Sequence, residues 1–440
     1  MHGKDTIAAL ATAPGRAGIG IIRVSGPKAC QLVERLVAAP VAWKPRVAMM
    51  ASWRDEDGQV LDQGLMLFFP APHSYTGEDV VELHAHGSPV LLRALLSRLY
   101  ALGCRPAEPG EFTRRALLHG KMDLSQAEAV IACIDAATVR AGKQAQRHLQ
   151  GVFGDKVAQF MEEITELLAY IEACLDFSEE EIPALDLVSL RQRVQSKLID
   201  PIQRLLGTSS FGMRLFEGAR VAIIGAPNVG KSSLLNALTG QERAIVSDVP
   251  GTTRDVLDAD FEIHGIPVRL VDTAGLRRAS DQVEREGIRR ARREAEQADL
   301  VIFVADAGRE ETWRDGDSAS VKVMNKVDLC PDLACPSGFI PISVRTGAGM
   351  SRLRSCLASM LEERDFSHED IFVTCQRHAH LLNEALLYLR EGAALLGGED
   401  TLDLVASRWR SAYGSLGEII GVGDVERILD RVFSRFCIGK

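Results

Sequence analysis

The stretch Gly225-Ala-Pro-Asn-Val-Gly-Lys-Ser232 decides the fold of the segment around it. It follows a short apolar run at 221–224, which predicts a strand, and precedes 233–238, which predicts a helix. A glycine-rich turn between a strand and a helix directs backbone N–H groups toward phosphates. Lys231 can add a positive charge for the β- and γ-phosphates, and the Ser232 hydroxyl can bind Mg²⁺. The stretch therefore predicts a P-loop that binds a nucleoside triphosphate.

Three further motifs follow the P-loop in chain order. An apolar run at 268–271 leads to Asp272-Thr-Ala-Gly275, where the aspartate can hold a Mg²⁺-bound water and the glycine amide can meet the γ-phosphate. Apolar runs at 300–304 and 321–324 then lead to Asn325-Lys-Val-Asp328. The Asp328 carboxylate can accept hydrogen bonds from guanine N1–H and its 2-amino group, which adenine lacks. Ser343-Val-Arg345, after a strand-like run at 339–342, is expected to give a last contact to the base. The motifs together favour GTP over ATP.

The group that orients the attacking water is less obvious. Leu276 follows Gly275, at the position where many GTPases carry a glutamine, and a leucine cannot orient water. Three candidates remain from the residues alone: Asn228 in the P-loop, and the acidic side chains of Asp281 and Glu284. A cation beside Asn228 could supply the electrostatic stabilisation that an arginine finger gives in other GTPases.

Longer stretches carry a resemblance to a known family. They are Ile245-Val-Ser-Asp-Val-Pro-Gly-Thr-Thr-Arg-Asp255, Asp272-Thr-Ala-Gly-Leu-Arg277 and the end Phe436-Cys-Ile-Gly-Lys440, with N-terminal stretches at 5–7, 11–26, 74–80, 109–116 and 121–129. Together they resemble the MnmE (TrmE) family of bacterial tRNA-modifying GTPases over nearly the whole chain.

The resemblance implies roles in the GTPase segment. Glu284 would position the attacking water through a second water, so that with Lys231 and Thr253 it forms the catalytic set. Mg²⁺ would be held by Ser232 and Thr253, and K⁺ by Asn228, Ser247, Val249 and Thr252. The full set expected at GTP is Asn228, Val229, Gly230, Lys231, Ser232, Ser233, Ser247, Asp248, Val249, Pro250, Gly251, Thr252, Thr253, Asp272, Thr273, Ala274, Gly275, Asn325, Lys326, Asp328, Ser343, Val344 and Arg345.

The resemblance also implies a folate site. Contacts to 5-formyltetrahydrofolate, or a related one-carbon carrier, match Arg23, Glu82, Lys121 and Lys440. A glutamate can accept hydrogen bonds from the pterin amino groups, and Arg and Lys can offset the folate carboxylates. Cys437 is a candidate catalytic thiol, but the residues alone leave it open between a functional and a structural role. His84 and His86 are interpreted as alternating strand residues, since no third metal ligand is placed.

Changes in periodicity suggest the domain organisation. Residues 1–119 mix β-like runs at 65–69 and 80–83 with helical stretches, which predicts an α+β domain. Helical patterns at 120–212 and 361–440 flank the GTPase segment, 213–360, and predict one all-helical domain interrupted by a Ras-like P-loop insertion. Ser125 with Glu128 predicts a capping box. The next helix is expected to bury one stripe made of Val157, Phe160, Ile164, Leu167, Leu168 and Ile171. The resemblance adds a tetrahydrofolate-binding fold to the N-terminal domain.

Composition sets limits on the partners and the compartment. The 440 residues include 51 basic and 60 acidic ones, a net charge of −9, so any tRNA contact must use local patches or a partner protein. Arg289-Arg-Ala-Arg-Arg293 is one such patch, although neighbouring glutamates favour a solvated helix face. Nine cysteines without a CxxC pair, and the absence of a signal peptide or a bilayer-spanning run, predict a cytoplasmic protein without a membrane segment. The short 307–320 connection is expected to trim the GTPase domain.

The function predicted from these features is GTP-driven tRNA modification. The resemblance implies a K⁺-activated GTPase, dimeric through its N-terminal domain. With the FAD-dependent partner MnmG, in a heterotetramer or larger complex, it would add an aminomethyl or carboxymethylaminomethyl group to C5 of the wobble uridine. Two alternatives stay open: a regulatory or ribosome-assembly GTPase, and a folate enzyme with a degenerate GTPase domain. Intact Lys231, Asp272 and Asp328 argue against the second alternative.

Overall fold

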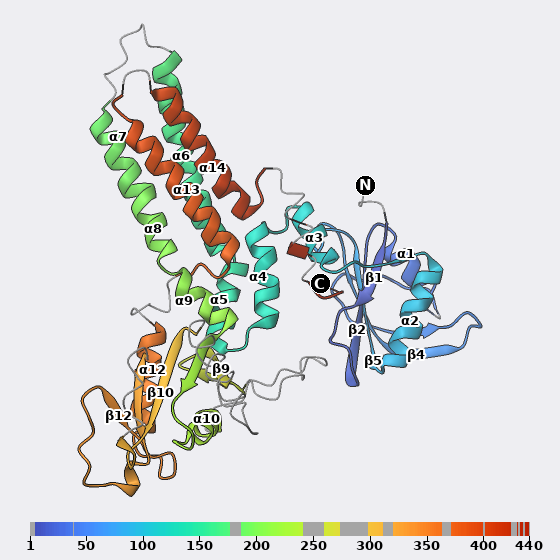
Figure 1. Ribbon diagram of the computed structural model, residues 1–440. Helices are drawn as coiled ribbons and strands as arrows, with labels where there is room; N and C mark the ends of the chain where they lie inside the picture. The colour runs from blue at the N-terminus through green and yellow to red at the C-terminus, as the bar shows by residue number, and fades with distance from the viewer. Residues whose placement is uncertain are drawn as a thin grey trace, which may run out of the picture. The chain divides into compact units, whose positions relative to one another are not determined.

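The computed structural model describes residues 5–37, 39–176, 186–240, 259–272, 298–310, 320–362, 371–398, 401–423, 429, 432–433 and 436–439. The chain divides into two compact units, and Figure 1 shows its elements. The first unit contains Met1–Ile131, His148–Met161 and Gly414–Lys440. The second contains Ala132–Arg147 and Glu162–Tyr413.

A six-stranded sheet forms the centre of the first unit. Its strand order is β3-β4-β5-β2-β1-β6, with all neighbours antiparallel except β1 and β6. The strands are β1 (Ile7–Leu10), β2 (Ala17–Ser25), β3 (Met49–Arg54), β4 (Val60–Phe69), β5 (Val80–Gly87) and β6 (Arg105–Pro106). The runs predicted as strands at 65–69 and 80–83 are thus confirmed.

The two faces of this sheet have different chemistry. Side chains alternate between the faces of a strand, so Ile22, Val24 and Leu83 share the face that packs on α1 (Ala29–Glu34) and α2 (Pro89–Leu102). Arg23 and Glu82 therefore lie on the opposite face. There, Ile7 and Ala9 pack with Phe112 of α3 (Glu111–Leu118).

Helix α4 (Leu124–Asp135) begins two residues earlier than a Ser125 cap would place it, because its cap differs from the prediction. The Asp123 carboxylate accepts hydrogen bonds from the Gln126 N–H (2.8 Å) and the Ser125 hydroxyl (2.7 Å), and the Gln126 side chain accepts from the Asp123 N–H (2.9 Å). The predicted Ser125 and Glu128 capping box is therefore wrong by two residues. The Asp123 carboxylate accepts both bonds at once, and Ser125 lies buried in the first turn of the helix.

Helices precede and follow the GTPase segment along the chain, and most of their residues belong to the second unit. Those before the GTPase segment are α5 (Val139–Leu149), α6 (Val152–Asp176), α7 (Leu187–Val194), a π-helical turn (Gln195–Ile199), α8 (Asp200–Leu206) and α9 (Ser209–Glu217); those after it are α13 (Gln376–Leu395) and α14 (Leu402–Ile420). The stripe predicted on α6 is buried except for half-buried Leu168.

The helical segments on either side of the GTPase segment contact each other. Arg191 of α7 donates to the Leu396 carbonyl (2.8 Å), and Arg390 of α13 donates to the Gln203 side chain (2.7 Å). Figure 1 shows α7 and α8 beside α13. Helices from two separated parts of the sequence therefore pack against each other, and the predicted domain limits stay a prediction.

The GTPase segment contains the second sheet, in the order β12-β11-β10-β7-β9-β8. All neighbours are parallel except β8 and β9. The elements are β7 (Ala219–Ile224), α10 (Lys231–Thr239), β8 (Ala259–Ile263), β9 (Ile266–Asp272), β10 (Leu300–Asp306), β11 (Val321–Asn325), a 3₁₀ turn (Val327–Leu329), β12 (Phe339–Pro341) and α12 (Met350–Glu362). The predicted strands and the P-loop helix are confirmed.

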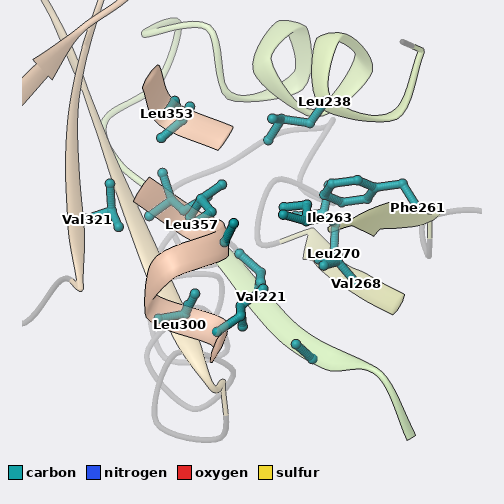
Figure 2. Packing of buried hydrophobic residues seen from close by; sticks show 14 of the residues in the cluster. Val221, Leu238, Phe261, Ile263, Val268, Leu270, Leu300, Val321, Leu353 and Leu357 are labelled. Carbon is teal, nitrogen blue, oxygen red and sulfur yellow. The ribbon is translucent and has the colours of Figure 1, made fainter. Parts of the chain in front are cut away.

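Apolar side chains from both ends of this segment form its core. Figure 2 shows Val221, Leu300 and Val321 from three strands close to Leu353 and Leu357 of α12. Leu353 and Leu357 are fully buried, which stabilises the fold by about 1.5–3 kcal/mol per side chain. The core fixes the carboxyl ends of β7, β10 and β11, where ligands bind in open α/β sheets.

Candidate functional site

The P-loop between β7 and α10 adopts a conformation that requires its glycines. Gly225 has φ 146° and Gly230 has φ 101°. A Cβ atom at Gly225 would lie 2.2 Å from the Val304 carbonyl oxygen, and one at Gly230 would lie 2.3 Å from Asn325 Nδ2. A backbone carbonyl of β10 and a side-chain amide at the end of β11 therefore approach the loop too closely for a larger residue.

Lys231 folds back over this loop. Its ammonium donates to the carbonyls of Gly225 and Ala226, both at 2.8 Å. Ser232 and Ser233 follow in the first turn of α10 and are exposed. The N-terminus of a helix offers free N–H groups and a positive dipole end, so this turn is suited to an anion. Val229 is fully buried and anchors the loop.

The Asn325-Lys-Val-Asp328 motif contacts the P-loop through its first two residues. The Asn325 amide donates to the Val229 carbonyl (2.9 Å), and its side-chain oxygen accepts from the Val344 N–H (3.4 Å). The Lys326 ammonium donates to the Asn228 carbonyl (2.8 Å). The structure thus brings together residues predicted from three separate motifs.

The remaining base-contacting candidates flank that motif. Asp328 is exposed in the 3₁₀ turn after β11, where its carboxylate is free to face a ligand from solvent. Ser343 is buried, and its hydroxyl accepts from the Thr346 N–H (3.2 Å), so it shapes the turn that carries half-buried Val344 and exposed Arg345.

Several predicted residues lie outside the described part of the chain. For Asp272, only the backbone at the end of β9 is described. The others are Ser247, Asp248, Val249, Pro250, Gly251, Thr252, Thr253, Thr273, Ala274, Gly275, Asp281, Glu284, the 289–293 patch, Lys440 and most of the 307–320 connection. Their roles stay predictions.

Two of the predicted folate residues form an ion pair on the face of the N-terminal sheet opposite α1 and α2. Arg23 and Glu82 are direct partners in the β2 and β5 register, and Arg23 donates to Glu82 Oε1 through Nε (3.0 Å) and Nη2 (2.9 Å). The guanidinium lies over the rings of Tyr75 (5.3 Å) and Phe112 (5.7 Å). Sequence reasoning missed these two rings, although both belong to stretches that carry the family resemblance.

The two histidines on β5 behave as strand residues, as predicted. His84 Nε2 lies 3.3 Å from Glu82 Oε2, and His86 Nδ1 lies 2.7 Å from Asp62 Oδ1. Their side chains belong to different pairs rather than to a shared ligand set. That these histidines bind no metal stays a prediction.

The other folate candidates come from the end of α3 and the end of the chain. Lys121 donates to the Pro72 carbonyl (3.0 Å). The C-terminal segment packs on the N-terminal domain, because Ile438 forms a β-bridge with Pro109 and the Gly110 N–H donates to the Cys437 carbonyl (3.4 Å). The Cys437 side chain is exposed. The Gly439 backbone has φ 103°, and a Cβ there would lie 2.0 Å from the Leu10 carbonyl oxygen.

A buried charge cluster near α3 was not predicted from the sequence. Arg115, 4% exposed, contacts Asp5 (2.8 Å), Glu111 (2.9 Å) and Glu78 (3.1 Å), and Arg105 pairs with Asp5 and Glu111. Glu78 also accepts from the Ser25 hydroxyl (2.8 Å). Beside the cluster lies a cavity of about 210 Å³, which is lined in part by Arg114 and His119. The signal that could have found the cluster is the density of charges in 105–115.

Hydrogen bonding sets the ionisation of two carboxyls in this cluster. Burial by itself raises the pKa of Glu111, but hydrogen bonds from Arg105, the Glu108 N–H and Arg115 outweigh it and hold that pKa below its ordinary value. The pKa of Asp5 is also lowered: burial opposes the shift, and Arg105 and Arg115 produce it. Both groups therefore stay charged in the folded protein at neutral pH.

These lowered pKa values predict acid sensitivity of the N-terminal unit. A carboxyl whose pKa is lower in the folded than in the unfolded state stabilises the fold above the unfolded pKa, which is about 4 for Asp and Glu. That contribution is lost as pH falls from there through the folded pKa. We expect thermal melting between pH 6 and pH 3 to show this loss. Glu111→Gln should flatten the curve, and an equally steep curve for that variant would contradict the assignment.

The fold and the site define a P-loop protein of the GTPase class, with a guanine-type recognition motif held against the phosphate loop. Comparison with known proteins makes the class specific. Residues 6–121 match the model for the GTP-binding protein TrmE N-terminus, and residues 124–437 match the model for the MnmE helical domain. The chain belongs to the MnmE family of tRNA modification GTPases.

Relatives in this family cover the chain from end to end. The tRNA modification GTPase MnmE of Xylella fastidiosa is 44% identical over 99% of this chain and 98% of its own length. The corresponding proteins of Azoarcus sp. (99% and 98%) and Proteus mirabilis (100% of each) are 43% identical. Among solved structures, the G domain of the T. maritima FeoB iron transporter is 28% identical over 32% of this chain and 98% of its own, with a TM-score of 0.25. Membership of the family supports GTP binding and hydrolysis and a role in tRNA modification.

Within the described ranges, no helix combines the length and the apolar character that crossing a bilayer requires.

Proposed function

We propose that the protein is a K⁺-activated GTPase that works with MnmG to add an aminomethyl or carboxymethylaminomethyl group to C5 of the wobble uridine of certain tRNAs. The observation that carries the proposal is the contact of Asn325 and Lys326 with the P-loop carbonyls of Val229 and Asn228, in a chain of the MnmE family. A loop arranged in this way ties guanine recognition to phosphate binding.

The residues of the P-loop have distinct tasks in the proposed hydrolysis. The N–H groups at the start of α10 bind the phosphates, and Lys231 leaves the Gly225 and Ala226 carbonyls to neutralise charge on the β- and γ-phosphates. Asp328 accepts from the guanine. Ser232 is exposed at the helix start, where a hydroxyl fits Mg²⁺. In the proposal Thr253 completes that site, and Glu284 holds the attacking water through a second water.

A monovalent cation fits the character of Asn228. Its side chain is exposed, its amide oxygen is a hard donor suited to K⁺, and its backbone has the left-handed φ of 65°. Ser247, Val249 and Thr252 complete the proposed ligand set. Bound K⁺ would supply positive charge to the transition state, in place of an arginine finger.

The sheet face that carries Arg23 and Glu82 has the chemistry to bind a folate. Glu82 can accept from pterin N–H groups, and the half-buried Tyr75 ring beside Arg23 provides an apolar surface. Lys121 and Lys440 would meet the folate carboxylates, and 5-formyltetrahydrofolate would supply a one-carbon unit. In the described state the Arg23 guanidinium donates to Glu82 and so fixes the orientation of that carboxylate.

The proposal extends to assembly and domain limits. We propose a homodimer through residues 1–119, a heterotetramer or larger complex with FAD-containing MnmG, tRNA as the macromolecular substrate, and a cytoplasmic location. The divisions 120–212, 213–360 and 361–440 complete the domain scheme. Cys437 is exposed beside the Gly110 backbone, where a functional thiol could reach a ligand, so its role needs a direct test.

Nucleoside mass spectrometry of bulk tRNA tests the proposal. In a deletion strain, we expect loss of the aminomethyl-type wobble uridine, recovery with the wild-type chain, and no recovery with Lys231→Ala or Glu82→Gln. Glu56→Gln, on an exposed turn, is the matched control and should restore the nucleoside. The Cys437→Ser lane decides that thiol's role.

An unchanged nucleoside profile in the deletion strain would refute the modification role and favour a regulatory GTPase. Recovery with Glu82→Gln would remove the folate half of the proposal and leave the GTPase half standing.

A further inference from the structure

The Asp306 side chain at the end of β10 faces the base-recognition motif rather than solvent. It is 8% exposed, and both carboxylate oxygens are used. Oδ1 accepts from the Gly308 N–H (3.0 Å), and Oδ2 accepts from the Lys326 ammonium (2.6 Å). Asp306 and Asn325 are partners in the parallel register of β10 and β11, so the two strand ends fix this arrangement.

The same ammonium reaches the P-loop. Lys326 Nζ donates to the Asn228 carbonyl (2.8 Å). Both Lys326 (φ 64°) and Asn228 (φ 65°) have left-handed backbones, a region that residues with a Cβ adopt uncommonly, although asparagine does so more readily than lysine. Surrounding contacts must hold such a conformation. Here a continuous chain of contacts runs from Asp306 through Lys326 to the Asn228 backbone.

We propose that Asp306 is a positioning residue for the monovalent-cation site: it aims Lys326 at the Asn228 carbonyl and thereby holds Asn228 in the conformation that presents its side-chain oxygen to K⁺. The inference rests on the proposed role of Asn228 in binding K⁺. It adds a residue that lies outside the P-loop, outside the base-recognition motif and outside the proposed ligand set.

The mechanism depends on charge. An ammonium held by one carboxylate keeps a fixed direction, and a hydrogen bond between charged groups is roughly twice as strong as a neutral one. Without that carboxylate, the Lys326 ammonium keeps its three N–H donors but no longer has a fixed orientation. Asn228 can then relax to a commoner backbone conformation. The affinity for K⁺ then falls, because part of the binding free energy must restore the conformation.

A purely local role for Asp306 gives a different expectation. Its bond to the Gly308 N–H caps the turn after β10, and loss of the cap would destabilise the segment whichever cation is present. Asp306→Asn separates the two roles, because an amide oxygen can still accept from Gly308 while the charge facing Lys326 is gone. Asp332→Asn, in an exposed loop of the same segment, is the matched control.

The test is isothermal titration of the full chain with a non-hydrolysable GTP analogue, as K⁺ replaces Na⁺ at constant ionic strength. For wild type and Asp332→Asn we expect tighter binding in K⁺. For Asp306→Asn, the K⁺ concentration that gives half of this gain should rise by at least about 5-fold, the lower end of usual coupling between sites. Binding in Na⁺ should change little. Lys326→Gln, which removes the other end of the ion pair, should also raise the K⁺ requirement.

The outcomes separate the inference from the function on which it rests. If wild type binds equally well in K⁺ and Na⁺, the proposed K⁺ role of Asn228 fails, and this inference fails with it. If wild type prefers K⁺ and Asp306→Asn keeps the wild-type K⁺ curve, only the positioning role is overturned. Equal weakening in both cations, with a lower melting temperature, would assign Asp306 to the turn alone.

Discussion

Lys231→Ala should reduce GTP hydrolysis by at least about 100-fold, because it removes a positive charge that stabilises the phosphates as charge develops in the transition state. The position of Lys231 supports this size of effect. Its ammonium already lies against the Gly225 and Ala226 carbonyls, inside the loop that would surround the phosphates. Steady-state release of phosphate from GTP measures the loss of hydrolysis. Titration of GDP measures any loss of phosphate binding.

A matched lysine separates this effect from a general loss of charge. Lys197 is exposed in the π-helical turn of the helical domain, and Lys197→Ala should keep wild-type hydrolysis. The melting temperature of Lys231→Ala should stay close to wild type, because the side chain is only half-buried and lies outside the hydrophobic core. Hydrolysis within a few-fold of wild type would show that another group neutralises the phosphates.

The parts of the GTPase segment that sequence alone predicts well are those with strong local signals. Strands β7, β10 and β11 are short apolar runs bounded by turn motifs, and a buried parallel strand needs such a run. The P-loop follows from the glycines, since no other residue fits Gly225 against the Val304 carbonyl. Motif order then places Asn325 and Lys326 near the loop, and the structure supplies the contacts.

What escaped prediction depends on contacts between distant residues. Tyr75 and Phe112 meet Arg23 only because β2, the loop before β5 and α3 converge on one face of the sheet. Asp306 ends an apolar strand and belongs to no recognisable motif. Its partner Lys326 lies twenty residues away, and nothing in the local pattern joins them.

The helix cap shows a second kind of limit. Both Asp123 with Gln126 and Ser125 with Glu128 satisfy the capping pattern, so the pattern itself does not choose. The choice comes from packing: Leu124 is fully buried among Phe433, Phe436 and neighbours, which fixes where the helix begins. Boundaries decided by tertiary packing in this way cannot be read from a window of a few residues.

Arg115→Met should be the most destabilising single substitution discussed, at about 3–5 kcal/mol of unfolding free energy. The side chain is 4% exposed and contacts the carboxylates of Asp5, Glu78 and Glu111. Methionine fills similar volume but leaves Glu78 with the Ser25 hydroxyl as its remaining described partner. Glu111 keeps its hydrogen bonds from Arg105 and the Glu108 N–H. Buried negative charge without sufficient compensation then opposes folding, and thermal and urea unfolding of the N-terminal unit would measure the loss.

Arg93→Met is the control for Arg115→Met. Arg93 is exposed on α2 and donates to the Pro89 carbonyl of its own helix (3.0 Å), so its replacement should change stability by no more than about 0.5 kcal/mol. Arg115→Met combined with Glu78→Gln should recover part of the loss, because the second change removes the charge that the first leaves uncompensated. Equal stability of the single and double variants would instead mean that Arg115 acts through the volume it fills, and its charge would then have no measurable role in holding α3 against the sheet.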